Sequence, residues 1–217
     1  MRMRSKPWAK EELNESKIYI QNPEKYKGKW RENFIKDNNP IHLELGCGKG
    51  YFVKTAALEN SDINYIAVVD VILGVANRKI LEEFDGKEIN NIILVRYDVE
   101  EIDKIFDKSD RIERIYINFC NPWPKPRHKK RRLTHTKQLE KYKKFLKENG
   151  EIYFKTDDDE LFKESLKYFK EAGFETIKTT MDLESEPEFW NNIETEHEIK
   201  FKSQGIKIKA GIFASIN

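Results

Sequence analysis

The sequence contains little cysteine, no long apolar run and almost no excess of either charge. Its two cysteines, Cys47 and Cys120, lack the spacing of metal ligands, and no apolar leader segment precedes them. We therefore expect no disulfide framework, no metal site and a cytoplasmic location. No apolar run approaches the roughly 18 residues that a membrane-spanning helix needs, so we expect no membrane segment. The net charge is only +2 although 36% of residues are charged, so positive charge matters by its location in the sequence.

Short apolar segments alternate with helix-length segments over most of the 217 residues. The expected strands are residues 41–45, 63–69, 91–95, 112–119, 151–155, 175–180 and 198–213, and the expected helices are residues 51–59, 73–84, 138–147 and 161–171. Several of these strands are apolar on both faces, which is typical of a parallel sheet covered on both sides. The pattern predicts an α/β domain at residues 41–217, preceded by a basic N-terminal arm at residues 1–40 that carries Arg2, Arg4 and Lys6.

A glycine-rich loop follows the first expected strand. The order is Glu44-Leu45-Gly46-Cys47-Gly48-Lys49-Gly50, so the glycines are spaced G-x-G-x-G. Glycines let the backbone turn tightly and approach a ligand, and doubly wound sheets bind ligands at the carboxyl ends of their strands. The G-x-G-x-x-G spacing of dinucleotide sites is missing, which leaves an oxidoreductase as a distant alternative. Glu44 suits a cationic ligand such as S-adenosylmethionine, and a plain turn with a solvated Glu44 is the other interpretation.

Two further acidic residues follow expected strands. Asp70 lies about 20 residues past the glycines, where a carboxylate can accept hydrogen bonds from ribose hydroxyls. Asp98 follows the next strand, where it suits the amino group of an adenine. Asp is also a favoured helix N-cap or turn residue, so a capping role stays open at both positions.

A dense basic segment follows the strand expected at residues 112–119. Six Lys and Arg residues and His128 lie between Lys125 and Arg132, directly after Asn121-Pro122-Trp123-Pro124. The prolines stiffen the approach to the segment. Trp123 offers a stacking face, worth roughly 1–3 kcal/mol per base in single-strand sites. The segment therefore predicts nucleic-acid binding, although a solvated run of charge and a core role for Trp123 are the alternatives.

These motifs together resemble the bacterial tRNA (guanine-N(7)-)-methyltransferase family. The resemblance runs nearly end to end and is most specific in Pro122-Trp123-Pro124-Lys125 and in the basic residues up to Leu133. It also covers residues 38–42, 154–157 and 195–201. It implies a seven-strand, Rossmann-like methyltransferase sheet with helices on both faces. It further implies methyl transfer from S-adenosyl-L-methionine to N7 of guanosine 46 in the variable loop of tRNA, with S-adenosyl-L-homocysteine as the second product.

The resemblance also implies roles for individual residues, carried over position by position. Donor binding is implied for Glu44, Gly46, Gly48, Asp70, Asp98 and Asn121. Substrate binding is implied for Lys125, Asp157, Thr195, Glu196, His197 and Glu198. The other cations of the basic segment are expected to hold tRNA phosphates: Arg127, Lys129, Lys130, Arg131 and Arg132. From the residues alone, Asp157 instead opens an acidic run at residues 157–160, which is expected to cap the following helix and to complement its dipole. Val69 also aligns with the family's acidic position, but only Asp70 can accept ribose hydroxyls.

Asn121 departs from the family, which commonly has Asp at this position. Guanine N7 already presents a lone pair, so its attack on the methyl group needs alignment and no general base. We expect Asn121 to act as the catalytic residue by positioning donor and guanine, with reduced or retuned activity because an amide lacks the carboxylate charge. The main alternative is a tRNA-binding protein that has lost methyl transfer. A different target base, and a monomer or a homodimer, stay open.

Overall fold

The computed structural model describes residues 8–69 and 73–216. Its strands are β1 (Tyr19–Ile20), β2 (Ile41–Leu45), β3 (Asn64–Val69), β4 (Ile92–Arg96), β5 (Ile112–Asn118), β6 (Leu146–Thr156), β7 (Phe174–Thr180) and β8 (Lys209–Ser215). Its α-helices are α1 (Ala9–Glu15), α2 (Tyr51–Glu59), α3 (Leu73–Phe84), α4 (Thr136–Tyr142), α5 (Asp159–Glu171) and α6 (Glu196–Lys202). Short 3₁₀ helices are η1 (Pro23–Tyr26), η2 (Trp30–Asn33), η3 (Val99–Lys104), η4 (Lys108–Asp110), η5 (Pro126–Arg131) and η6 (Leu183–Ser185).

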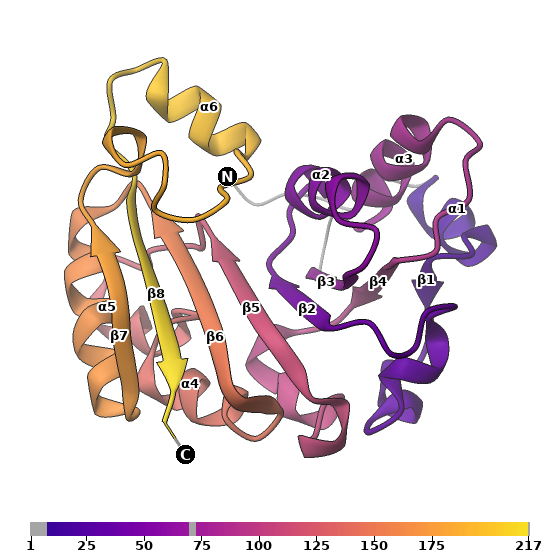
Figure 1. Ribbon diagram of the computed structural model, residues 1–217, viewed down its shortest axis with the longest axis horizontal. Coiled ribbons are helices and arrows are strands. Elements are labelled where there is room, and N and C mark those ends of the chain that lie inside the picture. The colour runs from indigo at the N-terminus through magenta and orange to yellow at the C-terminus, as the bar shows by residue number, and fades with distance from the viewer. Residues whose placement is uncertain (1–7, 70–72, 217) are drawn as a thin grey trace.

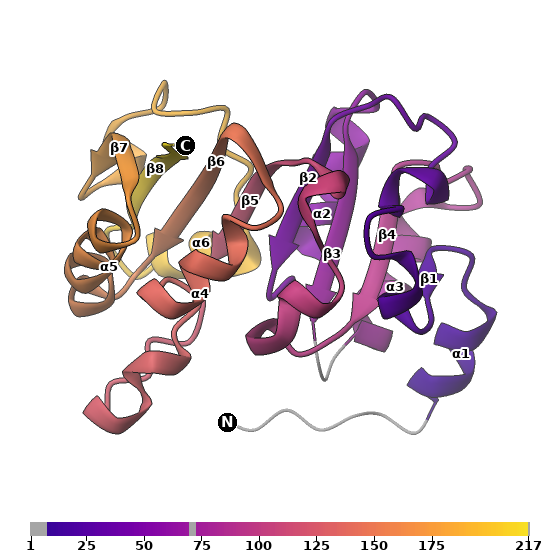
Figure 2. The same ribbon diagram turned by 90° about the horizontal axis from the view of Figure 1, so that it is seen from below.

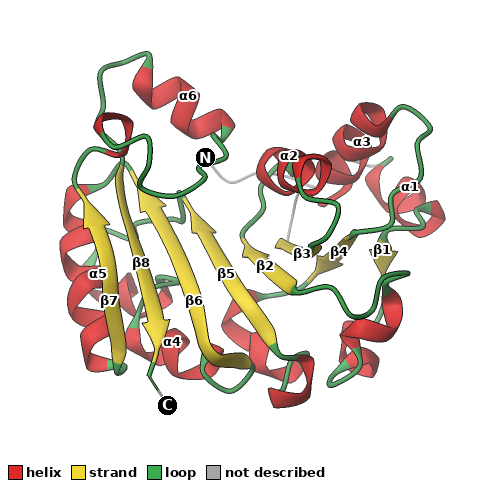
Figure 3. Ribbon diagram, in the orientation of Figure 1, coloured by secondary structure: helices red, strands yellow, loops and turns green. Residues whose placement is uncertain are grey.

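The strands form one sheet in the order β1-β4-β3-β2-β5-β6-β8-β7 (Figures 1 and 3). Neighbours from β1 to β6 run parallel, and β8 is antiparallel to both β6 and β7. The expected fold class is confirmed, with β1 as an additional short strand contributed by the N-terminal region. The strand order reverses direction between β2 and β5, which is where an open α/β sheet binds its ligand.

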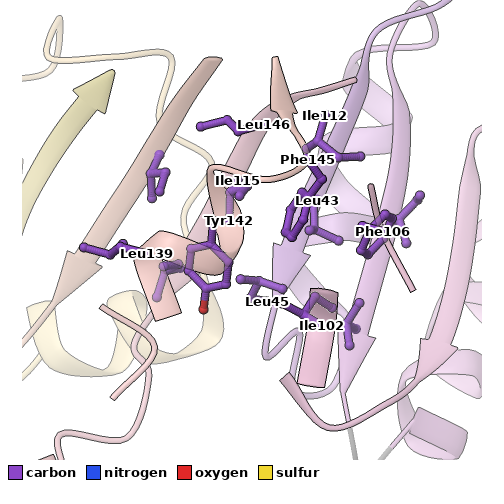
Figure 4. Close-up of a cluster of buried hydrophobic side chains, with 14 of the residues drawn as sticks. Leu43, Leu45, Ile102, Phe106, Ile112, Ile115, Leu139, Tyr142, Phe145 and Leu146 are labelled. Atoms are coloured by element: carbon purple, nitrogen blue, oxygen red, sulfur yellow. The ribbon is translucent and has the colours of Figure 1, made fainter. Parts of the chain in front are cut away.

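Hydrophobic side chains cover both faces of the sheet. Successive residues of a strand point to opposite faces, and β3 follows this rule: Ile66 and Val68 belong to the larger core cluster, whereas Tyr65 and Ala67 belong to a second cluster. The larger cluster includes side chains from α4 and α5, which lie behind β6 and β8 in Figure 1 and below them in Figure 2. Its centre, with Tyr142 between β5 and α4, is shown in Figure 4. The second cluster includes side chains from α1, α2 and α3.

The N-terminal region packs onto the rest of the chain. Trp30 is fully buried, and its indole Nε1 donates a hydrogen bond to the Ile105 carbonyl at 2.7 Å. The backbone N–H groups of Gly28 and Trp30 donate to the two carboxylate oxygens of Asp110, at 3.0 and 3.2 Å. Residues on both sides of position 40 therefore share one hydrophobic core. The domain boundary expected at residue 40 stays a prediction.

The contact between α1 and α3 depends on a glycine. A Cβ at Gly74 would lie 2.4 Å from Ala9 Cβ and 3.0 Å from Ala9 Cα. We expect Gly74→Ala to lower the free energy of unfolding by about 1–3 kcal/mol through overpacking, although alanine favours helix more than glycine does. Chemical denaturation of the variant, with exposed Glu82→Ala in the same helix as control, measures this change. A stability equal to that of the wild type would show that α1 is not packed against α3 in solution.

Two expected elements differ from the structure. The segment that we expected to be one strand at residues 198–213 contains α6 followed by β8. A start signal for α6 is present in the sequence: the Thr195 hydroxyl caps the helix by accepting from the Glu198 N–H at 3.1 Å, and acidic residues fill the first turn. The helix expected at residues 138–147 ends at Tyr142, because β6 begins at Leu146.

Within the part of the chain that the structure describes, no helix has the length and apolar character needed to cross a membrane. The same described residues contain no group of three or more His, Cys, Asp and Glu side chains arranged to hold a metal ion.

Candidate functional site: a pocket at the carboxyl ends of the strands

The glycine-rich loop after β2 is tied to the end of the neighbouring strand. The N–H groups of Gly46 and Cys47 both donate to the Val68 carbonyl, at 2.9 and 3.1 Å. Gly46 has φ +81° and Gly48 has φ +53°, conformations that side chains with a Cβ rarely adopt. The loop therefore turns away sharply from β2 and leaves space directly above the strand end.

Glu44 is buried below this loop. It is 3% exposed, and its Oε1 accepts a hydrogen bond from Asn118 Nδ2 at 3.2 Å. Its Oε2 has no hydrogen-bond partner among the described residues. Burial raises the pKa of Glu44 to about 7, while the hydrogen bond from Asn118, the charge of Lys155 and the nearby backbone N–H of Val53 act in the opposite direction. A buried carboxylate oxygen without a partner is costly, so this side chain is suited to receive a cationic group.

Glu44 lines a pocket of about 390 Å³. The lining residues are Glu44, Gly46, Cys47, Gly48, Lys49, Tyr51, Phe52, Val69, Asn118, Phe119, Thr195, Glu196 and His197. The pocket thus unites residues for which donor binding was predicted with residues 195–197, for which substrate binding was predicted, although about 150 residues separate them in the sequence. This result fits a site in which a donor and an acceptor meet.

Two predicted donor residues lie outside this lining, and a third falls outside the described residues. Asp98 is exposed, and its Oδ1 accepts from the Glu100 N–H at 2.9 Å as the N-cap of η3, which is the capping role that the sequence left open. Asn121 is exposed and lies beyond the end of β5. Asp70 is outside the described residues, so its predicted contact with ribose stays a prediction; Val69, the alternative, lines the pocket.

The backbone after β5 is bent into an unusual conformation. Phe119 has φ +51° and Trp123 has φ +41°, which is a strained arrangement for bulky side chains. The ring of Phe119 stacks on His197 of α6, with 5.9 Å between centroids and 19° between planes. Asn121 Oδ1 accepts from the Trp123 N–H at 3.0 Å and so stabilises the turn. This turn carries Phe119 to the pocket and Asn121 to the surface.

The segment at residues 195–198 forms the wall opposite the glycine-rich loop. Glu196 pairs with Lys49 of that loop at 3.3 Å and with Lys79 of α3 at 2.9 Å. Glu198, for which we predicted substrate contact, is 1% exposed, and both of its carboxylate oxygens are occupied by Lys155 and Asn192. The protein itself satisfies this carboxylate in the described arrangement, and substrate contact by Glu198 stays a prediction.

The end of β6 carries the predicted Asp157. Asp157 is half-buried directly after the strand, and its carbonyl accepts from Lys209 Nζ at 3.1 Å. The helix cap expected from the acidic run at residues 157–160 is confirmed: Asp158 is the N-cap, and its Oδ1 accepts from the Leu161 N–H at 2.7 Å. Substrate binding by the Asp157 carboxylate stays a prediction.

The basic segment is divided between exposed and internally paired cations. Lys125, Arg127, Lys130 and Arg131 are exposed on and beside η5. By contrast, Arg132 is 1% exposed and pairs with Glu164 and the Pro122 carbonyl. The guanidinium of Arg132 is buried against a carboxylate in the described arrangement, and its contact with a phosphate stays a prediction.

Two further members of the basic segment have partners of their own. Lys129 pairs with Glu160 at 2.8 Å and with Glu164 at 2.6 Å. The half-buried Trp123 packs against the Arg131 guanidinium, which lies 5.4 Å from its ring centroid, and against His128, with 5.6 Å between centroids. Internal pairing thus fixes one side of the segment to α5 and leaves the other side exposed to a polyanion.

Two residues of the site were missed in the sequence. Asn118 and Lys155 belonged to segments that the resemblance covers, but neither was given a role of its own in the site. A signal for both exists, because each polar side chain directly follows an apolar run, residues 115–117 or 152–154, at the ligand-binding edge of the sheet. Nothing in the sequence indicates, however, which partners these side chains find.

Comparison with known proteins agrees with this geometry. The profile of a family described as "Putative methyltransferase" matches residues 38–210. The chain is 56% identical over 213 residues to a tRNA (guanine-N(7)-)-methyltransferase of Clostridium botulinum (strain Eklund 17B / Type B), covering 96% of each chain. It is 53% identical to the protein of the same name from Clostridium perfringens (strain 13 / Type A), covering 96% of this chain and 97% of that protein.

A solved structure shows the same fold at low identity. The aminoglycoside resistance methyltransferase NpmB1 superimposes with a TM-score of 0.58 at 16% sequence identity, covering 82% of this chain and 87% of that one. This likeness concerns the fold alone, whereas the clostridial relatives match nearly the whole length. The chain belongs to the tRNA (guanine-N(7)-)-methyltransferase family.

Proposed function

We propose that this protein transfers the methyl group of S-adenosyl-L-methionine to N7 of guanosine 46 in the variable loop of tRNA. The observation that carries the proposal is the buried Glu44, which lines a pocket together with residues 195–197 and has one carboxylate oxygen without a hydrogen-bond partner among the described residues. Family membership supports the same activity, since relatives more than half identical over 213 residues bear that name. We also propose a cytoplasmic location, where unmodified tRNA is available.

The pocket residues fit the proposed donor. The methionyl part of S-adenosyl-L-methionine carries an α-ammonium group, which matches a buried carboxylate that lacks one partner. Gly46 and Gly48 leave the backbone open to close approach. We assign the ribose hydroxyls to Asp70. We assign the adenine amino group to the carboxylate oxygen of Asp98 that does not accept from the Glu100 N–H. When bound, the donor supplies an electrophilic methyl group on its sulfonium.

The chain's own contribution to the reaction is alignment. Guanine N7 has a lone pair and no proton to lose, so no side chain has to act as a base. Phe119 and His197 present stacked rings at the pocket, and we assign them to the guanine face. Asn121 then positions the base from the adjoining turn. Holding the two reacting atoms about 3–3.5 Å apart in the correct orientation accounts for most of the rate gain that such a site provides.

The exposed cations beside the pocket are proposed to hold the tRNA backbone. Lys125, Arg127, Lys130 and Arg131 follow the turn that carries Asn121 and lie on its outer side. Arg2, Arg4 and Lys6 belong to the same proposal, although they lie outside the described residues. Binding of this kind releases counterions and therefore weakens steeply as salt is added.

Replacing Asn121 with aspartate is expected to keep the turn and to maintain or raise turnover. A carboxylate oxygen retains the acceptor for the Trp123 N–H, and a full negative charge stabilises the positive charge that grows on the methylated base. We expect kcat to rise by up to about 10-fold, a modest part of what one well-placed electrostatic group can supply. Single-turnover methylation measures the effect, with Asn121→Ala as the variant that loses the acceptor. A large fall in kcat for Asn121→Asp would contradict the role given to charge.

The direct test is incubation with S-adenosyl-L-methionine and unmodified tRNA, followed by nucleoside mass spectrometry. We expect N7-methylguanosine as the product. Donor and tRNA binding without any methylated nucleoside would instead favour the tRNA-binding alternative. A methyl group on a different base would keep the reaction class and reject the assigned target.

A further inference from the structure

Lys155 lies at the ligand-binding edge of the sheet without touching bulk solvent. It is paired in register with Asn118, the residue that donates to Glu44. It is 1% exposed, and its aliphatic stem is enclosed near the ends of β5 and β6. Neither the donor residues nor the basic segment includes it. Its buried ammonium is therefore a charged group that the proposed chemistry leaves unexplained.

All three hydrogen-bond acceptors of this ammonium come from one short segment. Lys155 Nζ donates to Glu198 Oε2 at 2.6 Å, to Asn192 Oδ1 at 2.9 Å and to the Ile193 carbonyl at 2.9 Å. Asn192 Nδ2 in turn donates to the second oxygen of Glu198 at 2.7 Å. A side-chain ammonium has three donors, so the segment at residues 192–198 satisfies Lys155 completely.

The same segment supplies one wall of the pocket. Residues 195–197 line it, and His197 of this stretch stacks on Phe119. The Phe119 N–H donates to the Lys155 carbonyl at 2.9 Å, and Lys155 Nζ lies 6.0 Å from the Phe119 ring centroid. Lys155 thus contacts Phe119 through its backbone and its side chain, and it pairs with Glu198, the residue next to His197. Helix α6 begins within this segment, at Glu196, and in Figure 1 it lies beyond the carboxyl ends of β5 and β6.

The other polar attachments of this wall are exposed. The ion pairs of Glu196 with Lys49 and Lys79 involve side chains that are between 34% and 50% exposed. Pairs of this kind are screened by salt and contribute little. The Lys155–Glu198 pair, with side chains 1% and 2% exposed, is protected from such screening. The buried pair is therefore the polar attachment that we expect to fix the position of the wall, beside the apolar packing of Ile193 and Phe201.

We propose that Lys155 is a positioning residue, which holds residues 192–198 against the sheet so that Phe119 and His197 align the target base. This inference rests on the proposed function and adds a residue that touches neither donor nor guanine. It predicts that loss of Lys155 slows methyl transfer and leaves tRNA affinity nearly unchanged, since the exposed cations of η5 determine that affinity. A displaced wall is expected to lower kcat by about 100-fold, as small errors in alignment do.

The test compares Lys155→Met with Lys147→Met, in which a lysine at the opposite end of β6 loses its pair with Glu113. Turnover and tRNA affinity are measured for both variants, together with ¹⁹F NMR of protein labelled with 5-fluorotryptophan. Trp190 reports on the segment, because its Nε1 donates to Asn192 Oδ1 and its ring stacks on Tyr153. Trp30, buried in the core, reports on the global fold.

For Lys155→Met we expect an unchanged Trp30 signal, a shifted or broadened Trp190 signal, a kcat lowered about 100-fold and a tRNA Kd within about twofold of the wild type. Lys147→Met is expected to match the wild type. If Lys155→Met fails to fold because Glu198 is left charged and buried, the double variant Lys155→Met/Glu198→Met removes both charges and is expected to fold with the same low kcat.

A wild-type kcat in a folded variant, or an unchanged Trp190 signal, overturns the proposal. So does a tRNA Kd that rises in parallel with the loss of kcat, since Lys155 would then act in binding. Loss of the Trp30 signal in both the single and the double variant also overturns it, because Lys155 would then support the whole fold. Absence of methyl transfer by the wild type would instead reject the proposed function, and the Trp190 signal would still report on the segment.

Discussion

Replacing Glu44 with glutamine is expected to weaken binding of S-adenosyl-L-methionine by about 10–100-fold. The glutamine keeps the shape of the side chain and an acceptor for Asn118 Nδ2, but it removes the charge that faces the α-ammonium of the donor. Hydrogen bonds to charged groups contribute about 1.5–3 kcal/mol, and each 1.4 kcal/mol is about tenfold in affinity. Isothermal titration with S-adenosyl-L-homocysteine, which carries the same ammonium, measures the loss.

The matched control for this variant is Glu113→Gln. Glu113 lies near the amino end of β5, at the other end of the strand from Asn118, and it pairs with Lys147. Its replacement is expected to leave donor affinity unchanged. Equal affinities of Glu44→Gln and the wild type would show that the donor's ammonium does not bind at Glu44.

The pH dependence of donor binding follows from the same residue. Burial raises the pKa of Glu44 to about 7 in the free protein, so the carboxylate that the ammonium needs is formed only as pH rises through that value. Donor affinity is expected to increase with pH up to about 7 and then to level off, and Glu44→Gln is expected to abolish this increase.

The stability of the free protein is expected to change with pH in the opposite direction. The folded state binds this proton more tightly than the unfolded chain, so the Glu44 contribution to the free energy of unfolding falls between about pH 4.5 and 7.

Removing the four exposed cations of the basic segment is expected to abolish most of the tRNA affinity. The variant carries Lys125→Gln, Arg127→Gln, Lys130→Gln and Arg131→Gln. Each phosphate contact that is lost lowers the slope of log affinity against log salt by about 0.7–0.9, so we expect the slope to fall by about 3 and affinity at low salt to fall by at least about 100-fold. Fluorescence anisotropy of labelled tRNA over a range of salt concentrations measures both quantities.

The control for the basic segment removes the same number of charges from the other end of the sheet. Lys36, Lys108, Arg111 and Lys144 are exposed near the amino ends of the strands. Their joint replacement with glutamine is expected to leave the salt slope within about one unit of the wild type. If both fourfold variants lost the same affinity, tRNA would be attracted by total charge, and the basic segment would have no special role.

The sequence predicts the fold and one half of the site well. Alternating apolar strands and helices are local patterns, and they determine where Glu44 and the glycines must lie, because the carboxyl ends of parallel strands share an edge. The position of residues 195–197 in the same pocket was expected only from the family resemblance. Their approach to Glu44 depends on tertiary packing, which sequence patterns do not describe.

The burial of two charged residues, which the sequence did not predict, has a common physical origin. Arg132 and Glu198 are charged residues in polar stretches of sequence, and such residues are mostly exposed in proteins. Each is buried here because a partner of opposite charge, Glu164 or Lys155, lies more than 30 residues away in the sequence. The identity of such a partner depends on the fold. The same reason explains why the sequence does not indicate a role for Lys155, whose partners lie 37–43 residues away.

The most direct test of the account is to map the methyl group on tRNA. Two transcripts that differ only in guanosine or adenosine at position 46 are incubated with the protein and S-adenosyl-L-methionine, and N7-methylguanosine is located by borohydride reduction and aniline cleavage. We predict cleavage at position 46 of the first transcript and no cleavage of the second. Equal methylation of both transcripts, or N7-methylguanosine at another position, would contradict the account.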